Sequence, residues 1–159
     1  MSRFRILSVG RGMPKLEKGL FDDYASRMKR YGGLELLEIA EGRRVGKESD
    51  ATRKKAKADE AARMAEKMDK RLWIALDRGG KPLDSEGLAK QIQTWHEAGD
   101  RDVGLLIGGP DGLDASLLQK CRFKLAFGPM TFPHMLVRVM VAEQLYRAMT
   151  IQHGVPYHR

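Results

Sequence analysis

In the segment LLIGGPDGL, residues 105–113, an apolar strand runs into a loop with three glycines and a proline. A second loop of the same kind, FGPMTFPH, occupies residues 127–134. In open α/β sheets, ligands bind in loops just beyond the carboxyl ends of the strands. Loops of this kind leave backbone N–H and C=O groups without partners in the sheet. The two segments therefore predict a binding site for a small ligand.

The glycines of the first loop do not form a nucleotide-binding fingerprint. Residues 108–113 lack the Gly-Lys-Ser/Thr ending of a P-loop, which argues against a nucleoside triphosphatase. Gly10 and Gly12 follow the first apolar run, but Lys15 stands where a dinucleotide-binding motif has its third glycine. We interpret Gly10 and Gly12 as a turn between a strand and a helix.

Outward from these loops, apolar strand-like runs alternate with helix-like segments along the whole chain. The expected strands cover residues 4–9, 34–39, 72–76, 103–107 and 121–127. The expected helices cover residues 14–29, 50–70, a segment that begins at Ser85, 114–120 and 135–151. Strands that are apolar throughout and separated by helices indicate a mostly parallel sheet with helices on both faces. We therefore expect a single α/β domain over residues 1–159.

The helices carry signals at their ends and on their faces. Ser49 and Ser85 are expected to cap the second and third helices, because a hydroxyl there accepts a hydrogen bond from a free N–H group of the first turn. One stripe of the first helix, with a residue at every fourth position, consists of Leu16, Leu20, Tyr24 and Met28. One face of the third helix consists of Leu88, Ile92 and Trp95.

The chain is basic, with 29 Lys and Arg against 21 Asp and Glu and a formal net charge of +8. This excess favours an anionic partner, a nucleic acid first and a membrane surface second, although a basic solvated surface without such a partner is the alternative. Residues 43–57 hold seven basic side chains against two acidic ones. They are the best candidate for contacts to phosphate groups, and a mobile loop followed by a solvated helix face is the competing interpretation.

Several classes of protein are excluded by composition. The single cysteine, Cys121, rules out an intramolecular disulfide and is interpreted as a small core residue. The four histidines do not have metal-ligand spacing, so no metal is expected. No apolar run reaches the roughly 18–20 residues that cross a bilayer. Residues 1–5 lead into a strand rather than a signal peptide. A cytoplasmic protein without a membrane partner is expected.

The most specific features of the sequence lie in its last third. They are residues 105–113, Pro133-His134, residues 136–139, residues 142–148 and the tail Pro156-Tyr157-His158-Arg159. Together with Val9-Gly10, Met13-Pro14, Leu76-Asp77 and Gly80-Lys81-Pro82, this pattern resembles the SPOUT methyltransferases that methylate N3 of a pseudouridine in large-subunit (23S) ribosomal RNA. The resemblance covers nearly the whole chain. It implies a trefoil knot in the carboxyl-terminal half, with the methyl donor S-adenosylmethionine held in the knot.

The resemblance also implies which residues contact the donor. They are Leu76, Gly108 and the loop residues Phe127, Gly128, Pro129, Met130, Thr131 and Phe132. Valine in place of Gly108 is expected to fill space that the donor needs and to leave the fold largely intact.

Methyl transfer to a uracil-type N3 requires that the N3 proton leave. A general base such as His134, His158 or Glu143 can take it, or a cation such as Arg138 or Arg159 can stabilise the developing anion, and the sequence does not choose between them. Tyr157 or His158 could instead stack on the base.

Two of these candidates have structural alternatives. Glu143 and Arg147 are four residues apart, so an intrahelical ion pair competes with a catalytic Glu143. The polar tail, residues 153–159, is expected to lie over a donor pocket, that of a partner in a homodimer, and a disordered end is the alternative.

The expected partner is ribosomal RNA within the assembled ribosome, because the chain has no visible RNA-recognition module. Two other functions remain open from the residues alone. A non-catalytic ribosome-associated RNA-binding protein would explain the charge but not the paired glycine/proline loops. A small-molecule enzyme could use the same loops for an anionic substrate.

Overall fold

A five-stranded sheet forms the centre of the computed structural model, which describes residues 3–159; residues 1 and 2 of the expected domain lie outside the described residues. The strand order is β2-β1-β4-β3-β5, and every pair of neighbouring strands is parallel. The strands are β1 (Phe4–Val9), β2 (Leu34–Ile39), β3 (Leu72–Pro82), β4 (Val103–Ile107) and β5 (Phe123–Ala126). The parallel sheet predicted from the apolar runs is therefore confirmed.

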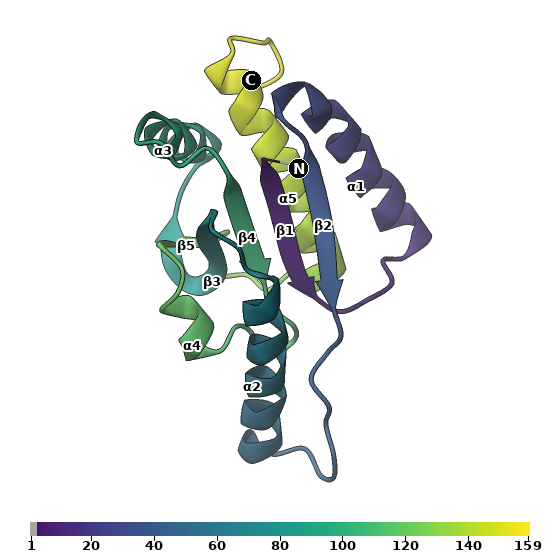
Figure 1. Ribbon diagram of the computed structural model, residues 1–159. Helices are drawn as coiled ribbons and strands as arrows, with labels where there is room; N and C mark the ends of the chain where they lie inside the picture. The colour runs from purple at the N-terminus through teal and green to yellow at the C-terminus, as the bar shows by residue number, and fades with distance from the viewer. Residues whose placement is uncertain (1–2) are drawn as a thin grey trace.

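Helices cover both faces of this sheet, as expected. They are α1 (Lys15–Met28), the 3₁₀ turn η1 (Lys29–Tyr31), α2 (Asp50–Lys67), α3 (Ser85–Glu97), α4 (Ala115–Leu118) and α5 (His134–Gln152). Figure 1 shows α1, α3 and α5 grouped around one face, while α2 and α4 lie on the other. Within residues 3–159, no helix is long and apolar enough to cross a membrane. The trefoil knot stays a prediction.

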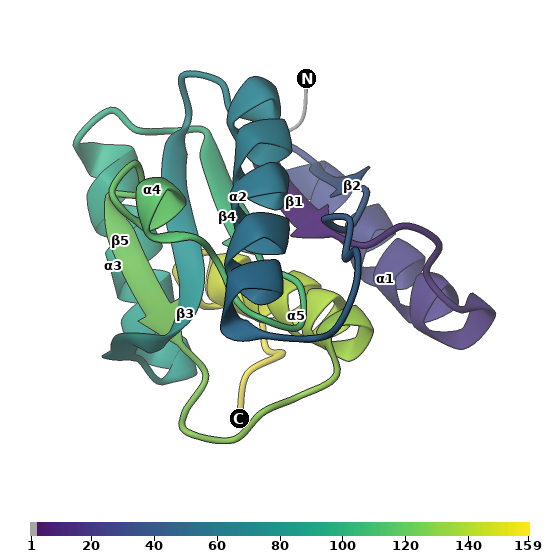
Figure 2. The same ribbon diagram turned by 90° about the horizontal axis from the view of Figure 1, so that it is seen from below.

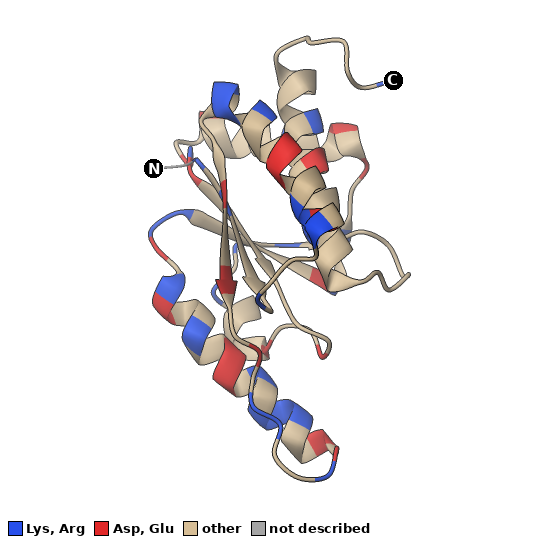
Figure 3. Cartoon of the chain, turned by 90° about the vertical axis from the view of Figure 1, so that its right-hand side faces the viewer, with Lys and Arg blue, Asp and Glu red and all other residues tan. Residues whose placement is uncertain are grey.

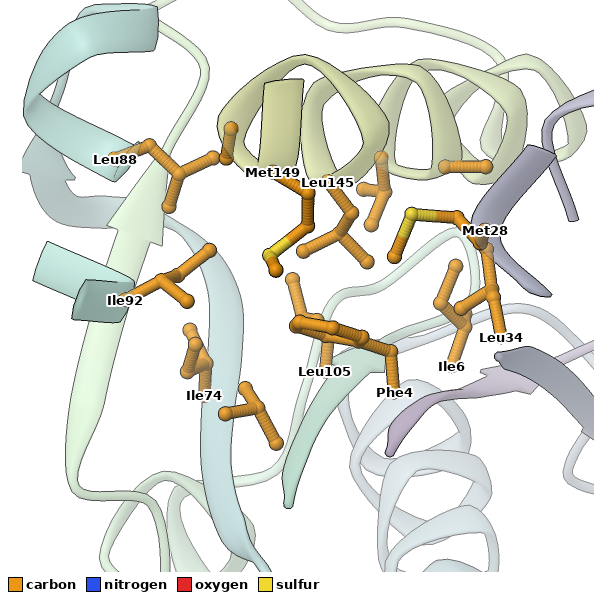
Figure 4. Packing of buried hydrophobic residues seen from close by; sticks show 14 of the residues in the cluster. Phe4, Ile6, Met28, Leu34, Ile74, Leu88, Ile92, Leu105, Leu145 and Met149 are labelled. Atoms are coloured by element: carbon orange, nitrogen blue, oxygen red, sulfur yellow. The ribbon is translucent and has the colours of Figure 1, made fainter. Parts of the chain in front are cut away.

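Two hydrophobic clusters, one on each face, follow from the alternation of side chains along the strands. In β1, Phe4 and Ile6 point into the cluster under α1, α3 and α5, while Leu7 and Val9 point toward α2 and α4. Figure 4 shows Leu145 and Met149 of α5 packed against this first face of the sheet. Because both of its faces are covered, β4 is buried throughout and has no polar side chain, whereas β1 carries Arg5 and Ser8 among its apolar residues.

The third strand is longer than the sequence indicated. Leu125 of β5 is opposite both Leu76 and Lys81, so residues 77–80 bulge out and β3 then continues to Pro82. Gly80 allows this return, since a Cβ there would lie 2.7 Å from the backbone of Lys124. The two glycines that indicated the end of the strand are therefore part of a bulge.

The helix caps agree with the sequence at one place and differ at another. Ser49 caps α2, because its Oγ accepts a hydrogen bond from the Thr52 N–H at 3.2 Å, and the helix ends three residues before the expected Lys70. Ser85 was expected to cap α3, and this is wrong: Asp84 accepts the hydrogen bond from Gly87 N–H at 2.7 Å. Ser85 instead donates to Gln144 of α5 at 2.6 Å.

The apolar stripe of α1 is only partly buried. Met28, at the end near the sheet, is fully buried, whereas Leu20 is 51% and Leu16 80% exposed. The chain therefore presents leucine side chains to the outside beside the face of the sheet that carries α5.

Candidate donor-binding and active site

The main candidate site is a cavity of about 340 Å³ at the carboxyl edge of the sheet. This volume lies in the range of roughly 300–1,000 Å³ that is typical of small-molecule sites. Its walls come from the end of β3, from the loop after β4 (residues 108–113), from the loop after β5 (residues 127–132), from the first turn of α5 and from Lys57 of α2. Figure 2, seen from this edge, shows both loops.

The structure brings together nearly all the residues that were expected to contact the donor. The ones that line the cavity are Leu76, Gly108, Phe127, Gly128, Met130, Thr131 and Phe132. Pro129 does not line it; its carbonyl oxygen accepts a long hydrogen bond from Arg78 Nη2 at 3.4 Å. Contact of these residues with the donor stays a prediction.

The loop after β4 folds tightly on itself. Gly112, with φ of +81°, donates its N–H to the Gly109 carbonyl oxygen at 3.0 Å. A Cβ on Gly108 would lie 2.7 Å from the carbonyl carbon of Gly112. Valine at 108 would therefore displace this loop, because the neighbouring backbone already fills that space. That the rest of the fold stays largely intact remains a prediction.

The loop after β5 offers hydrogen-bond donors to a ligand. The backbone N–H groups of Gly128, Met130, Thr131 and Phe132 have no acceptor within residues 3–159. On the inner side, Phe127 and Phe132 pack against the hydrophobic cluster under α5. The cavity thus combines an apolar wall with free N–H groups.

A buried carboxylate lies behind the glycine loop, and the sequence analysis missed it. Glu60 of α2 is 4% exposed and accepts a hydrogen bond from Gly42 N–H at 3.1 Å. A Cβ on Gly109 would lie 3.5 Å from both of its oxygens. Burial raises the pKa of Glu60; Asp111 in the loop adds to this rise. The helical spacing could have indicated its burial, since Glu60 lies four residues from both Ala56 and Met64 on the buried side of α2.

Arg44 and Asp111 connect the basic segment to the glycine loop. Arg44 Nη2 forms an ion pair with the carboxylate of Asp111, which lines the cavity. The same guanidinium reaches Glu48 at 3.4 Å. Sequence spacing could not indicate this contact, because 67 residues separate the two partners.

His134 and Arg138, one turn apart on α5, have different surroundings. His134 lines the cavity, and a Cβ on Gly10 would lie 3.2 Å from its Nε2. Arg138 is completely buried: it donates to Ser8 Oγ at 2.9 Å, to the carbonyl oxygens of Val9 and Gly10 at 2.9 and 2.7 Å, and to Glu38 Oε2 at 2.6 Å. Arg138, considered from the sequence as a cation that can stabilise a developing anion, therefore does not face the cavity. Its N–H groups hold the end of β1 instead.

Three other catalytic candidates, Glu143, Tyr157 and His158, form a network along the middle and the second half of α5. Arg147 Nε donates to Glu143 Oε1 at 2.9 Å, so the intrahelical ion pair is present. Tyr157 folds back and donates its hydroxyl proton to the same oxygen at 3.0 Å. Burial raises the pKa of Tyr157, and the hydrogen bond to Glu143 raises it further. His158 Nδ1 lies 3.1 Å from Arg147 Nη1 and its Nε2 lies 3.5 Å from Glu86 of α3.

These two groups of candidates are therefore far apart within one chain. Along α5, at 1.5 Å per residue, Glu143, which holds Tyr157, lies about 14 Å from His134, and Arg147, which contacts His158, lies about 20 Å from it. Figure 1 shows the tail at the opposite end of the molecule from the arrowheads of β1 and β2, where the cavity opens. One chain does not bring Tyr157, His158 or Arg159 to its own cavity.

Two further expectations concern metals and Cys121. No group of three His, Cys, Asp or Glu side chains within residues 3–159 is arranged to hold a metal ion. Cys121 is partly buried against the cluster under α2, and burial raises the pKa of its thiol to about 11. A thiol with such a pKa is not a ready nucleophile at neutral pH, which agrees with its interpretation as a packing residue.

Comparison with known proteins decides the family. A family model described as "Predicted SPOUT methyltransferase" matches residues 2–158. The chain belongs to the SPOUT methyltransferases. A relative from Magnetococcus marinus, named Ribosomal RNA large subunit methyltransferase H, is 81% identical over 159 residues and is covered completely, as is this chain. A relative of the same name from Alkalilimnicola ehrlichii is 44% identical over 157 residues, 99% of each chain.

Solved structures support the fold of this SPOUT methyltransferase. A probable methyltransferase from Bordetella pertussis Tohama I superposes with a TM-score of 0.56 over 93% of this chain and 96% of that one, at 18% identity. A probable methylase family protein from Haemophilus influenzae has the same TM-score over 99% of this chain and 71% of that one, at 14% identity. The family that the sequence resembled is therefore confirmed.

SPOUT methyltransferases take the transferred methyl group from S-adenosylmethionine, and the cavity has the chemistry to hold it. Leu76 and Phe127 supply an apolar wall for a flat ring. Free N–H groups of residues 128–132 suit its ring nitrogens and hydroxyls. The carboxylates of Asp77 and Asp111 suit its positively charged groups.

Proposed function

We propose that this chain is the methyltransferase that transfers a methyl group from S-adenosylmethionine to N3 of a pseudouridine in 23S ribosomal RNA. The observation that carries the proposal is the cavity between two glycine/proline loops at the carboxyl edge of a SPOUT sheet. The names of the relatives, which cover the full chain at 81% and 44% identity, support ribosomal RNA as the substrate. Pseudouridine N3 as the acceptor rests on the resemblance of the sequence motifs.

In this reaction the donor supplies a methyl group on a sulfonium, so the protein's task is to orient the two reactants and to deal with the N3 proton. Correct orientation alone removes roughly 7–11 kcal/mol of barrier in well-aligned systems. His134 is the imidazole at the cavity, within reach of a group bound there. Arg138 is not available to stabilise the anion, because its N–H groups are bonded to buried acceptors. We therefore assign the proton step to His134 or to a tail from another chain.

The outer face of α5 supports a homodimer. Apolar residues occur all around this helix, and a helix of that kind is normally covered on every side. A groove of about 550 Å³ runs along its outer face, lined by Leu20 of α1, by Leu88 of α3 and by Val139 and Met140 of α5. A second copy of the chain, presenting the same leucine-rich face, fits this groove as an isologous partner.

An isologous contact through α5 would also complete the active site. In such a dimer the two α5 helices lie side by side, and in an antiparallel arrangement the carboxyl end of one lies beside the amino end of the other. The tail with Tyr157, His158 and Arg159 would then reach the partner's cavity, where His134 begins α5. This geometry explains how residues about 14–20 Å apart along α5 in one chain can serve one reaction.

We expect the methyl mark to depend on this protein and on assembled ribosomes. A 159-residue chain has little surface for reading RNA sequence, so the shape of the particle should provide selectivity. Mass spectrometry of 23S nucleosides from cells with and without the protein should reveal N3-methylpseudouridine only in its presence. Purified ribosomes should be methylated, and short naked RNA should not. If the nucleosides of 23S RNA are the same with and without the protein, the proposed acceptor is overturned. If the protein in addition does not bind S-adenosylmethionine, the alternative of a non-catalytic RNA-binding protein is favoured.

Deletion of residues 157–159 is expected to abolish methyl transfer while donor binding and the dimer mass persist. The tail lies away from the cavity; it contacts Glu86 of α3, and it contacts Glu143 of α5 and Tyr24 of α1 at the edge of the groove. Methyl transfer to ribosomes, calorimetry with S-adenosylhomocysteine and light scattering would measure the three properties. Tyr157→Phe, which removes the hydroxyl and its hydrogen bonds with Glu143 and Tyr24 but keeps the ring, serves as the matched control for tail anchoring. Full activity of the truncated protein would assign the chemistry to His134 alone.

A further inference from the structure

The seven basic side chains of residues 43–57 are not equivalent in the structure. Arg44 is paired with Asp111 and Glu48, and Arg53 is paired with Asp50 and Glu48. The other five have no carboxylate within 4.0 Å among residues 3–159. These five residues, named the basic face below, are Arg43, Lys47, Lys54, Lys55 and Lys57. Figure 3 shows the basic residues of α2 and of the loop before it at one end of the molecule.

The basic face leads to the rim of the donor cavity. Lys57 itself lines the cavity, and Lys54 lies one turn before it on α2. Hydrogen bonds from Ser116 lower the pKa of Asp114, and the charges of Lys57 and Lys54 lower it further, so the field of both lysines reaches the start of α4. The amino end of α2 adds its own partial positive charge beside Lys47.

Arginines that already have partners hold the loop before α2 in place. Arg63 of α2 donates to the carbonyl oxygens of Ala40 and Glu41 at 2.9 and 2.8 Å and so holds the base of the loop before α2. Arg44 holds the tip of the loop before α2 against the glycine loop through its ion pair with Asp111. In these ion pairs the carboxylates already neutralise the guanidinium charge and occupy part of its N–H donors, so a phosphate would have to compete with them.

We propose that the basic face binds the phosphate backbone of the substrate RNA next to the cavity, and that Arg44 and Arg53 position the loop without contacting phosphate. The proposal rests on the proposed function and deepens it, because it assigns the RNA contacts to five of the seven basic residues. Phosphates bound there would place an adjacent nucleotide at the rim of the cavity, beside Lys57.

RNA fits this face better than a membrane surface does. A helix that lies on a bilayer needs an exposed apolar face, but the apolar residues of α2, Ala56, Ala61 and Met64, are buried in the protein. Val45, at 67% exposure, is the one large apolar side chain exposed in residues 40–67.

The salt dependence of RNA binding tests the proposal, because each phosphate contact contributes about 0.7 to the slope of log K against log salt for single strands. The double variant Lys47→Gln/Lys54→Gln should lower the slope by about 1.4 for a 20-nucleotide RNA, measured by fluorescence anisotropy. The matched control Arg44→Gln/Arg53→Gln removes the same charge from the same loop and helix. It should leave the slope unchanged.

Three outcomes would overturn the proposal: an unchanged slope in the lysine variant, an equal loss of slope in the arginine variant, or binding to phosphatidylserine vesicles with the RNA slope unaffected. A calorimetric titration of the unmodified protein with S-adenosylhomocysteine separates this proposal from the proposed function. Donor binding with an unaltered slope in the lysine variant rejects only the basic face. A lysine-dependent slope without donor binding rejects only the methyltransferase function.

Discussion

Gly108→Ala is expected to weaken donor binding by about tenfold or more, which corresponds to about 1.4 kcal/mol of binding free energy. The new Cβ would lie 2.7 Å from the Gly112 carbonyl carbon and 3.0 Å from the Leu113 N. Both are backbone atoms that cannot rotate away, so the loop must move and the wall of the cavity moves with it. Calorimetry with S-adenosylmethionine and a thermal unfolding curve would separate loss of binding from loss of folding.

Gly19→Ala is the matched control for this experiment. Gly19 is exposed in α1, where a Cβ would meet no atom within 4 Å. Alanine in a helix interior is more stable than glycine by roughly 0.5–1 kcal/mol, so the control should be slightly stabilised. Its donor affinity should not change. Normal donor affinity in a folded Gly108→Ala protein would place the donor site elsewhere.

Arg138→Met is expected to lower the free energy of unfolding by about 3–5 kcal/mol, as loss of one partner of a buried ion pair does. The carbonyl oxygens of Val9 and Gly10 and the hydroxyl of Ser8 would lose their donor in a site without water access. Glu38 would lose its partner as well, although it is 27% exposed. Urea denaturation followed by circular dichroism measures the change.

Two further variants make this prediction specific. Arg122→Met removes an exposed ion pair with Asp100 and should change stability by no more than about 1 kcal/mol. Arg138→Lys keeps the charge but not the planar set of N–H donors, so it should remain destabilised. If Arg138 acted only in catalysis, Arg138→Met would lose activity with unfolding unchanged, and the positioning role argued here would be rejected.

Much of the fold was accessible from the sequence because its signals are local. The strands β1, β2 and β4 were predicted with their observed bounds, because each is a short, mostly apolar run between helix-like segments. The signal failed at β3, where Gly79 and Gly80 indicated a turn. Only the pairing of Lys81 and Pro82 with β5, a contact across the sheet, reveals that the strand resumes.

The candidate site, like the fold, was predictable only where its signals are local. The two glycine/proline loops indicated a ligand site because parallel strands end at one edge, and seven of the eight residues expected to contact the donor do line one cavity. The roles of charged side chains were harder to predict, because burial and ion pairing depend on distant residues. Arg44 was among the residues expected to contact phosphate, but it forms an ion pair with Asp111. The sequence could not indicate this partner, because it is 67 residues away.

The parallel α/β sheet, the position of the loops at its carboxyl edge and the family can be predicted from the sequence, because each depends on patterns over a few neighbouring residues or on motif order. Two features follow only from the assembled fold: Arg138 holds β1 rather than a reactant, and the tail lies against Glu143 and Arg147 of α5, away from its own cavity. Arg138 and Ser8 are 130 residues apart in the chain. The energy of a charged side chain depends on which acceptors surround it, and those neighbours exist only once the sheet and helices have assembled.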